Sequence, residues 1–490
     1  MNNRLVIYFH YDPRGQADTA CRFAVQAMRK QARVLLFVHN GTLDTDSRAW
    51  LERQNIPVLE RENEGLDVGA YRQALLHIGQ EELRTFDEVV LMNYTLAGPV
   101  RPLEEMFARM DSRRELDFWG LSRHYAMRSR RFGKNGFVPE HIQSHFIAVR
   151  PRMYEDFWAY WQKIELPRSY EDSVRLHETR FTEYFSALGY RWDTVVDGDA
   201  WRDLFVNPIM GCPRELIERE SCPFFKRRSF FTPYADELRR TDGCAAARLY
   251  EFLKKEDTFP VDDLIRSLLP TQPLAQMSRN LHWHYLLPQE TGEKPVSLTA
   301  QQLENGAVLS PEKIYSVQTP LRSKGVLRWY EQQMIWPDDG AAATLFARYP
   351  VLGVLGPAMP LYLPAVQAEG KCWKKDLPHL QARMRELGLK IPLDPEMPLP
   401  GSSGGCLLLR GAAFPQGLPP IHCDADFRLL PLIAQQNGYY SADVRTWLQA
   451  AACADVHEAA LQPTLTLSGA GKLLARRIKH TLLSRKEGDE

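Results

Sequence analysis

Apolar runs and amphipathic stretches alternate along the first part of the chain. The pattern predicts strands over residues 5–10, 33–39, 56–59 and 88–92 and helices over residues 17–30 and 68–78. Strands that alternate with helices in this way form a parallel sheet, whose connections are right-handed crossovers. The sequence therefore predicts an α/β domain, in which a ligand would bind at the carboxyl ends of the strands.

The same alternation continues towards residue 240. Further strands are expected over residues 117–121 and 144–149, and further helices over residues 153–164 and 178–188. The stretch 207–234 is rich in proline, aromatic and basic residues and looks like the closing element of a domain. We therefore expect the first domain to cover residues 1–240.

The second half of the chain has a different pattern. Helical periodicity covers residues 245–255 and 261–268, and strand-like runs cover residues 351–355 and 406–409. We expect a helical connector over residues 241–300 and a second α/β domain over residues 301–466. The uncharged run 349–368 contains four prolines, which would break a membrane-spanning helix, so buried strands and turns are expected there.

Composition narrows the classes of function. The 61 basic and 61 acidic residues cancel, so no chain-wide charge attracts nucleic acid, and no nucleic-acid partner is expected. The apolar stretch 5–9 is too short for the core of a signal peptide, which predicts a cytoplasmic protein. The 8 cysteines are dispersed without close ligand spacing, so no metal site and no structural zinc are expected.

The most specific pattern is the segment NEGLDVGAYR at residues 63–72, between an expected strand and an expected helix. Its glycines let the backbone approach a ligand closely, and the following helix offers free amide groups. Asp67 can accept hydrogen bonds from a sugar or a base. The same residues also suit a tight strand-to-helix turn that Asp67 caps.

This segment and three later ones resemble the rhamnan synthesis F (RgpF) family, in the order that the family has them. The later segments are 91–99, 117–120 and 141–146. The resemblance implies a GT-A-like, that is Rossmann-like, α/β glycosyltransferase domain at the N-terminus. Segments 352–357 and 404–410 resemble the end of longer family members, so the second domain would be a degenerate glycosyltransferase-like unit.

The resemblance also implies a donor site. In GT-A enzymes a DxD motif holds a divalent metal on the donor pyrophosphate, but here Asn93-Tyr94-Thr95 stands where the family has Asn-Asp-Ser. The neutral oxygens of Asn93 and Thr95 bind magnesium weakly, so no cofactor is assigned and dependence on Mg²⁺ or Mn²⁺ is doubtful. The implied donor-binding residues are His10, Asp12, Asn63, Gly65, Asp67, Arg72, Asn93 and Thr95.

His10 and Asp12 end the first strand, where GT-A enzymes seat the nucleotide base, although an aspartate there is as often a turn former. The departing nucleoside diphosphate develops charge, for which cationic groups are needed. The candidates for this role are His141, Lys226, Arg227 and Arg228, although the last three also fit a solvated basic surface. Gln143 and Ser144 open an expected strand and could contact the donor or acceptor sugar.

Inverting transfer needs a carboxylate that takes the proton of the attacking hydroxyl. The segment 177–185 resembles the family's helix at this position, and Glu178 at its start is the expected catalytic base. Glu183 lies about 140° around the helix from Glu178 and should face elsewhere. The alternative is that Glu178 is only a helix-start acid, favoured there by the helix dipole.

The C-terminal segment 467–490 has a basic amphipathic pattern between Ser468 and Lys486. Such a helix could lie on the inner face of the cytoplasmic membrane or pack on its own domain.

By resemblance, the expected function is transfer of a sugar, rhamnose from dTDP-rhamnose or a similar donor, to a lipid-linked oligosaccharide in lipopolysaccharide O-antigen or rhamnan synthesis. The alternatives are a non-catalytic glycan-binding or polysaccharide-assembly protein and a nucleotide-sugar hydrolase.

Overall fold

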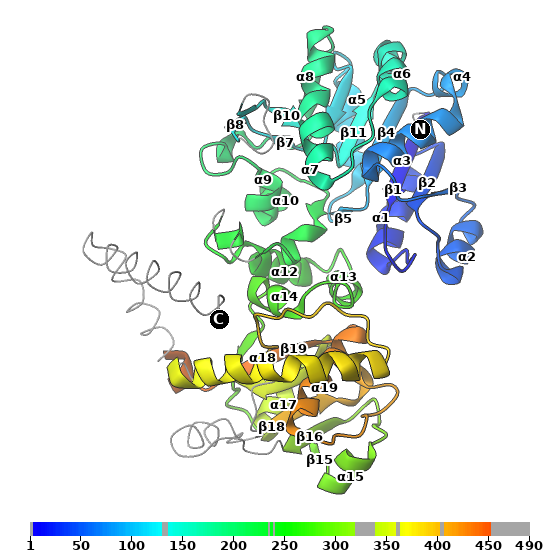
Figure 1. Cartoon of the computed structure of the whole chain (residues 1–490). Helices are drawn as coiled ribbons and strands as arrows, with labels where there is room; N and C mark the ends of the chain where they lie inside the picture. The colour runs from blue at the N-terminus through cyan, green and yellow to red at the C-terminus, as the bar shows by residue number, and fades with distance from the viewer. Residues whose placement is uncertain are drawn as a thin grey trace, which may run out of the picture. The chain divides into compact units, whose positions relative to one another are not determined.

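The computed structural model describes residues 3–129, 136–233, 236–238, 241–318, 339–358, 363–401 and 406–451. The chain forms two compact units, Met1–Ser267 and Leu268–Glu490 (Figure 1). The division lies later than the expected boundary near residue 240, because α12 (Ala245–Glu256) and nearly all of α13 (Val261–Leu268) belong to the first unit. Phe259, between these helices, packs edge-on against Phe23 and Phe225, with ring centroids 5.6 and 5.5 Å away.

The first unit is built on a seven-stranded sheet with the order β12-β6-β11-β4-β1-β2-β3. Its strands are β1 (Arg4–His10), β2 (Val34–Asn40), β3 (Val58–Arg61), β4 (Glu88–Asn93), β6 (Phe118–Gly120), β11 (Phe146–Val149) and β12 (Trp192–Thr194). The expected α/β fold is confirmed. The sheet is mixed rather than wholly parallel, however, since β11 runs antiparallel to both β4 and β6.

The reversal of β11 has a local cause. After β6 the chain forms β7 (Arg123–His124) and β10 (His141–Ile142), which pair with each other in antiparallel register. No helix lies between β6 and β11 among the described residues, so the chain turns back and enters β11 in the opposite direction.

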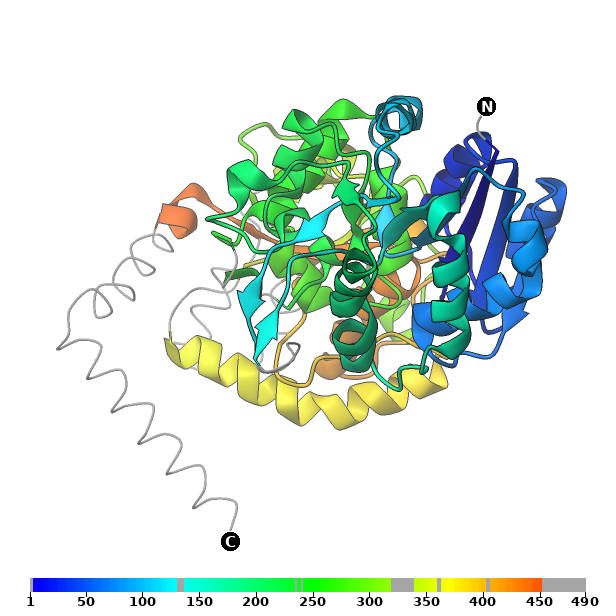
Figure 2. The ribbon, with the colours of Figure 1, turned by 90° about the horizontal axis from the view of Figure 1, so that it is seen from above.

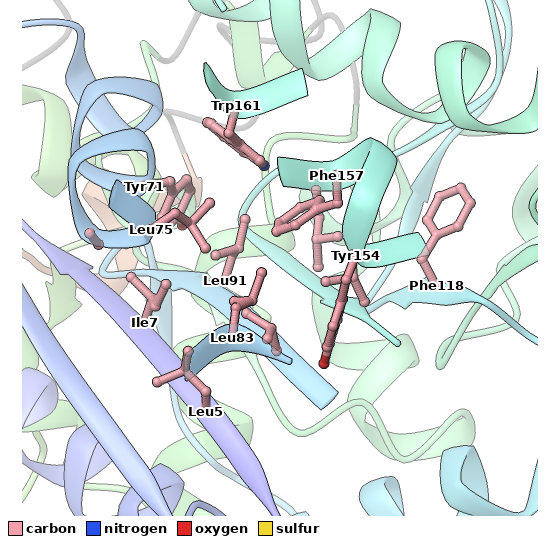
Figure 3. Packing of buried hydrophobic residues seen from close by; sticks show 14 of the residues in the cluster. Leu5, Ile7, Tyr71, Leu75, Leu83, Leu91, Phe118, Tyr154, Phe157 and Trp161 are labelled. Atoms are coloured by element: carbon pink, nitrogen blue, oxygen red, sulfur yellow. The ribbon is translucent and has the colours of Figure 1, made fainter. Parts of the chain in front are cut away.

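Helices cover both faces of this sheet. One face carries α3 (Leu66–Ile78), α6 (Tyr154–Lys163) and α8 (Thr179–Ala187), and the other carries α1 (Thr19–Lys30) and α5 (Leu103–Ser112). Successive residues of a strand point to opposite faces, so Leu5 and Ile7 enter the core cluster with Tyr71 and Phe157 (Figure 3). Arg4 faces the other way and lies over the ring of Phe107 in α5.

The second unit contains a six-stranded sheet with the order β14-β19-β17-β18-β16-β15. Its strands are β14 (His284–Leu286), β15 (Val296–Ser297), β16 (Ile314–Gln318), β17 (Leu352–Pro357), β18 (Cys406–Arg410) and β19 (Tyr440–Arg445). Its helices include α14 (Leu274–Asn280), α17 (Asp339–Arg348), α18 (Leu363–Glu386) and α19 (Leu429–Gln436). The unit is α/β, as expected.

Two expectations for this half were wrong in detail. The stretch 241–300 is not wholly helical, because β14 belongs to the second sheet. The run 349–368 contains β17, but from Leu363 it is the start of α18, the long helix drawn in yellow in Figure 2. Pro364 does not prevent this, because proline is tolerated in the first turn of a helix.

Within the described part of the chain, no helix has both the length and the apolar character that crossing a membrane requires. The predicted basic helix over 467–490 lies outside the described residues.

Candidate active site

The glycine-rich segment forms the turn between β3 and α3. Gly65 adopts a φ of +70°, and a Cβ at Gly69 would lie 2.2 Å from the carbonyl oxygen of Glu64. Glycine is required at both positions, because another residue would be strained at the first and would clash with the backbone at the second. The turn delivers Asp67 into the first turn of α3.

Asn63 supports this turn with its side chain. The amide of Asn40, at the end of β2, donates to Oδ1 of Asn63 at 3.0 Å and to the carbonyl oxygen of Leu66 at 3.2 Å. Arg61 in turn donates to Oδ1 of Asn40 at 2.7 Å. These bonds fix the shape of the loop.

Asp67 lies at the junction of three segments. Its Oδ1 accepts hydrogen bonds from the hydroxyl of Ser173 at 3.2 Å and from the amide of Val68 at 3.0 Å. Its Oδ2 accepts from the side-chain amide of Asn93, at the end of β4, at 3.4 Å. Burial and the nearby charge of Glu178 raise the pKa of Asp67 above its ordinary value.

The triplet 93–95 carries a chain of hydrogen bonds away from Asp67. Oδ1 of Asn93 accepts from the amide of Thr95 at 3.2 Å and also from its hydroxyl. The hydroxyl oxygen of Thr95 accepts from Nζ of Lys226 at 3.1 Å. Tyr94 instead packs edge-on against the rings of Phe9 and His10. Burial raises the pKa of Tyr94 to about 12, so its hydroxyl is neutral.

This donor set does not fit a divalent metal. Mg²⁺ prefers carboxylate and phosphate oxygens, and the triplet offers only one amide and two hydroxyl oxygens. In the described part of the first unit, no three His, Cys, Asp or Glu side chains bring their ligand atoms together. The nearest fixed positive charge is Lys226.

Lys226 reaches the site from a distant part of the sequence. It lies in β13 (Phe225–Lys226), which pairs in antiparallel register with β5 (Leu96–Ala97), directly after the triplet. Burial lowers the pKa of Lys226 to about 8, an effect that the charges of Glu178 and Asp67 oppose and that of Arg228 reinforces. The ammonium group therefore lies among two carboxylates and a second cation.

Glu178 is expected at the start of a helix, but in the structure it lies inside a continuous helical run. The run consists of α7 (Tyr170–Ser173), a π-helical turn (Val174–Glu178) and α8. The preceding turns satisfy the backbone amides, so Glu178 does not face a helix N-terminus, and the dipole explanation for an acid here is wrong. Single π turns inside α-helices are frequent at functional sites.

The carboxylate of Glu178 is held on one side only. Its Oε2 accepts from the backbone amide of Ser144 at 3.0 Å and from its hydroxyl at 2.7 Å. Its Oε1 lies 4.0 Å from Nε2 of His141, beyond hydrogen-bond distance. Burial favours the neutral acid, but His141, the bonds from Ser144 and Lys226 outweigh it and hold the pKa of Glu178 below its ordinary value.

His141 has a tautomer set by its surroundings. Its Nδ1 lies 2.8 Å from the carbonyl oxygen of Pro139, to which it donates, so Nε2 is the ring nitrogen that faces Glu178. Among the described residues, no group forms a hydrogen bond with this buried nitrogen. A hydroxyl that binds between Nε2 and Oε1 of Glu178 can donate its single proton to the carboxylate.

His10 and Asp12 form hydrogen bonds with their own surroundings. Nδ1 of His10 lies 3.0 Å from Nδ1 of His39, and burial followed by the proximity of His39 lowers the pKa of His10 to about 3. Oδ1 of Asp12 accepts from the backbone amide of Arg14 at 2.8 Å, which is the turn-forming geometry.

Arg72 and Gln143 also form hydrogen bonds with the scaffold. The guanidinium of Arg72 donates to the carbonyl oxygen of Gln162 in α6 at 3.4 Å. The side chain of Gln143 accepts from the hydroxyl of Ser122 at 2.9 Å and donates to Oδ1 of Asn207 at 3.3 Å. Arg227, the middle residue of the basic run 226–228, forms a buried ion pair with Asp18 and does not face Asp67 and Glu178.

The structure thus brings together Asp67, Asn93, Thr95, Glu178 and Lys226, here termed the central cluster. Sequence reasoning missed two neighbours of this cluster. The hydroxyl of Ser173 donates to Asp67, and the guanidinium of Arg228 lies over the ring of Tyr170, 6.0 Å from its centroid. Neither lies in a segment that resembles a motif. Their approach to Asp67 depends on how the helical run packs against α3, which no local pattern encodes.

Comparisons with known proteins agree with this architecture. The family model described as rhamnan synthesis protein F matches residues 35–308. An uncharacterized protein of Sinorhizobium fredii, y4gN, is 26% identical over 188 residues, which are 38% of this chain and 46% of that protein. The matched region thus spans less than half of that relative's length.

Two solved enzyme structures resemble part of this chain. Glucosyl-3-phosphoglycerate synthase of Mycobacterium tuberculosis, in complex with Mn²⁺, UDP-glucose and phosphoglyceric acid, is 12% identical and matches 31% of this chain and 58% of its own, with a TM-score of 0.22. A mannosyltransferase of Pyrobaculum calidifontis, in complex with GDP-mannose and Mn²⁺, is 14% identical and matches 39% and 54%, with a TM-score of 0.27. Because the family model matches more than half of the chain, this protein belongs to the rhamnan synthesis protein F family.

Proposed function

We propose that the protein is a glycosyltransferase that moves a sugar from a nucleoside diphosphate donor to an acceptor hydroxyl. The observation that carries the proposal is that three groups meet in the central cluster. They are the hydrogen-bonded carboxylate of Asp67, the carboxylate of Glu178, which Ser144 holds through Oε2, and the buried ammonium group of Lys226. These three groups come from segments far apart in the sequence. Membership of the rhamnan synthesis protein F family supports the same activity.

In this proposal Lys226 and Arg228 stabilise the leaving group. The bond between the anomeric carbon and the diphosphate oxygen breaks with its electrons on the diphosphate, whose charge rises. The ammonium of Lys226, on the hydroxyl of Thr95, supplies positive charge beside the triplet where related enzymes hold a metal. Asp67 accepts hydrogen bonds from hydroxyl groups of the donor.

Glu178 acts as the base in direct displacement. Its free oxygen, Oε1, takes the proton of the acceptor hydroxyl while that oxygen forms the new bond to the anomeric carbon. The low pKa of Glu178 keeps it ionised at neutral pH. Attack opposite the diphosphate inverts the anomeric centre.

The finer assignment follows the family description. We propose a donor such as dTDP-rhamnose and a lipid-linked oligosaccharide acceptor in surface polysaccharide synthesis, with the protein at the inner face of the cytoplasmic membrane. The family's description as a rhamnan synthesis protein supports the sugar. The basic amphipathic pattern of 467–490 supports the location.

One observation favours a second function. Tyr94 stands where a metal-binding acid is expected, and its neutral hydroxyl cannot replace a carboxylate. A protein that lost catalysis in this way would bind donor or glycan without turnover.

Measurement of released nucleotide distinguishes a transferase, a binding protein and a nucleotide-sugar hydrolase. The purified protein is incubated with a panel of nucleotide sugars, with and without a lipid-linked acceptor. A transferase releases nucleotide only when the acceptor is present, a hydrolase releases it in both cases, and a binding protein releases none.

Asp67→Asn is expected to raise the donor dissociation constant by about tenfold to a hundredfold, because charge-assisted hydrogen bonds are lost. The melting temperature should not fall, since the substitution removes a buried charge that faces Glu178. Calorimetric titration and thermal unfolding measure the two effects. Asp46→Asn, in the first turn of α2 (Thr45–Arg53), is the matched control and should leave both unchanged. Unaltered donor affinity in Asp67→Asn would remove this residue from the donor site.

Metal dependence gives a separate prediction. Protein dialysed against EDTA should turn over donor at the same rate whether or not Mg²⁺ or Mn²⁺ is added back, because the triplet 93–95 provides no carboxylate. Turnover that appears only when either ion is returned would show that another donor set holds a catalytic metal.

A further inference from the structure

Three side chains with metal-binding atoms meet in the second unit, which the proposed function does not use. His379 lies in α18, and Cys423 and Asp426 lie at the start of the 3-10 helix η6 (Asp424–Arg428). Nε2 of His379, Sγ of Cys423 and Oδ1 of Asp426 all lie within 4.8 Å of one another. Nε2 is 2.7 Å from Oδ1 and 3.5 Å from Sγ.

The carboxylate of Asp426 is already oriented towards this cluster. Its side chain is 1% exposed, and its Oδ2 accepts from the backbone amides of His422 at 2.8 Å and of Cys423 at 3.2 Å. These bonds to Oδ2 fix the carboxylate while Oδ1 contacts His379, as outer partners orient a metal ligand.

Arg383 also approaches Asp426, but its terminal nitrogens bond to other groups. Its Nε is 3.5 Å from Oδ1, while its terminal nitrogens bond to Glu386 at 2.6 Å and to the carbonyl oxygen of Pro420 at 3.1 Å. The guanidinium is therefore held by other acceptors.

One member of the cluster, Cys423, is exposed and lines a cavity of about 550 Å³. His422, Asp424 and Glu304 also line this cavity. A small molecule or a water can therefore reach the cluster from the side of the thiol.

We propose that His379, Cys423 and Asp426 bind a zinc ion. Nitrogen, sulfur and oxygen ligands from three residues, with a fourth position open to a cavity, match the donor set of an exchangeable zinc site. Binding replaces the hydrogen bond between His379 and Asp426: the thiol proton leaves to solvent, and the ring proton moves from Nε2 to Nδ1, which leaves a lone pair on Nε2 for the metal. Sequence spacing did not reveal the site, because Cys423 lies 44 residues from His379.

The test uses the full-length protein without a histidine tag, freed of metal by dialysis and titrated with Zn²⁺ in a calorimeter. One ion should bind per chain. Cys423→Ser and His379→Gln should each weaken binding by at least about tenfold to a hundredfold, since even outer partners of a ligand have effects of that size. Co²⁺ in place of Zn²⁺ should give a thiolate charge-transfer band that Cys423→Ser abolishes.

Two controls match the removed groups. Cys372→Ser removes a partly exposed thiol in α18, and His77→Gln removes an exposed imidazole in α3. Both variants should bind Zn²⁺ as the wild type does. Absence of Zn²⁺ binding, wild-type affinity in either cluster variant, or Co²⁺ binding without the thiolate band would each overturn the proposal. None of these readouts depends on transferase activity. The test of the zinc site is therefore independent of the proposed function.

Discussion

Glu178→Gln is expected to lower kcat by about a hundredfold to ten-thousandfold while donor affinity stays near that of the wild type. The amide keeps the shape of the side chain and can still bond to Ser144, but it cannot take a proton from the acceptor. Only the chemical step should suffer. Single-turnover transfer measures that step, and titration with the nucleotide sugar measures donor binding.

Glu183→Gln is the internal control for this prediction. Glu183 is on the same helical run, but its side chain is 58% exposed and pairs with Arg180 at 2.9 Å. It therefore faces away from the central cluster, and its loss should leave kcat near normal. Equal activity of the two variants, or a larger loss in Glu183→Gln, would remove Glu178 from the role of base.

Lys226→Met is expected to lower kcat/KM by about a hundredfold to a thousandfold, which is the effect of removing one group that stabilises a developing negative charge. Methionine keeps most of the apolar stem, so the loss should come from the ammonium group. Lys163→Met, at the exposed end of α6, removes a lysine outside the cluster and should be neutral. A Lys226→Met enzyme with normal kcat/KM would show that the leaving group is stabilised elsewhere.

The pH profile tests the same role without deleting the side chain. Lys226 is charged below its pKa of about 8 and neutral above it, so kcat/KM should decline as the pH rises through about 8. Lys226→Arg keeps the charge at higher pH and should move the decline upward. A decline at the same pH in both proteins would assign it to another group.

Local patterns predicted much of the first unit. Continuous apolar runs predicted β1, β2 and β4, which are buried along almost their whole length, and the pattern between β3 and β4 predicted α3, all with small errors at their ends. The glycine pattern around Asp67 predicted the turn, because positive φ and close backbone approach leave glycine as the residue that fits.

Features that depend on contacts distant in sequence were not predictable in the same way. The antiparallel direction of β11 depends on a short strand pair, and the π turn before Glu178 shifts that residue from a helix start to a helix interior. The position of Lys226 depends on the pairing of β13 with β5. Resemblance named Glu178, Asn93 and Thr95, but only the fold relates them to Lys226 and Ser173.

The most direct test of the central claim is a crystal structure of Glu178→Gln with an intact nucleotide-sugar donor. The account predicts diphosphate oxygens within about 3.2 Å of Nζ of Lys226, and an anomeric carbon that faces the carboxamide of residue 178. A diphosphate bound outside the central cluster, or held there by a metal ion with Lys226 turned away, would contradict it.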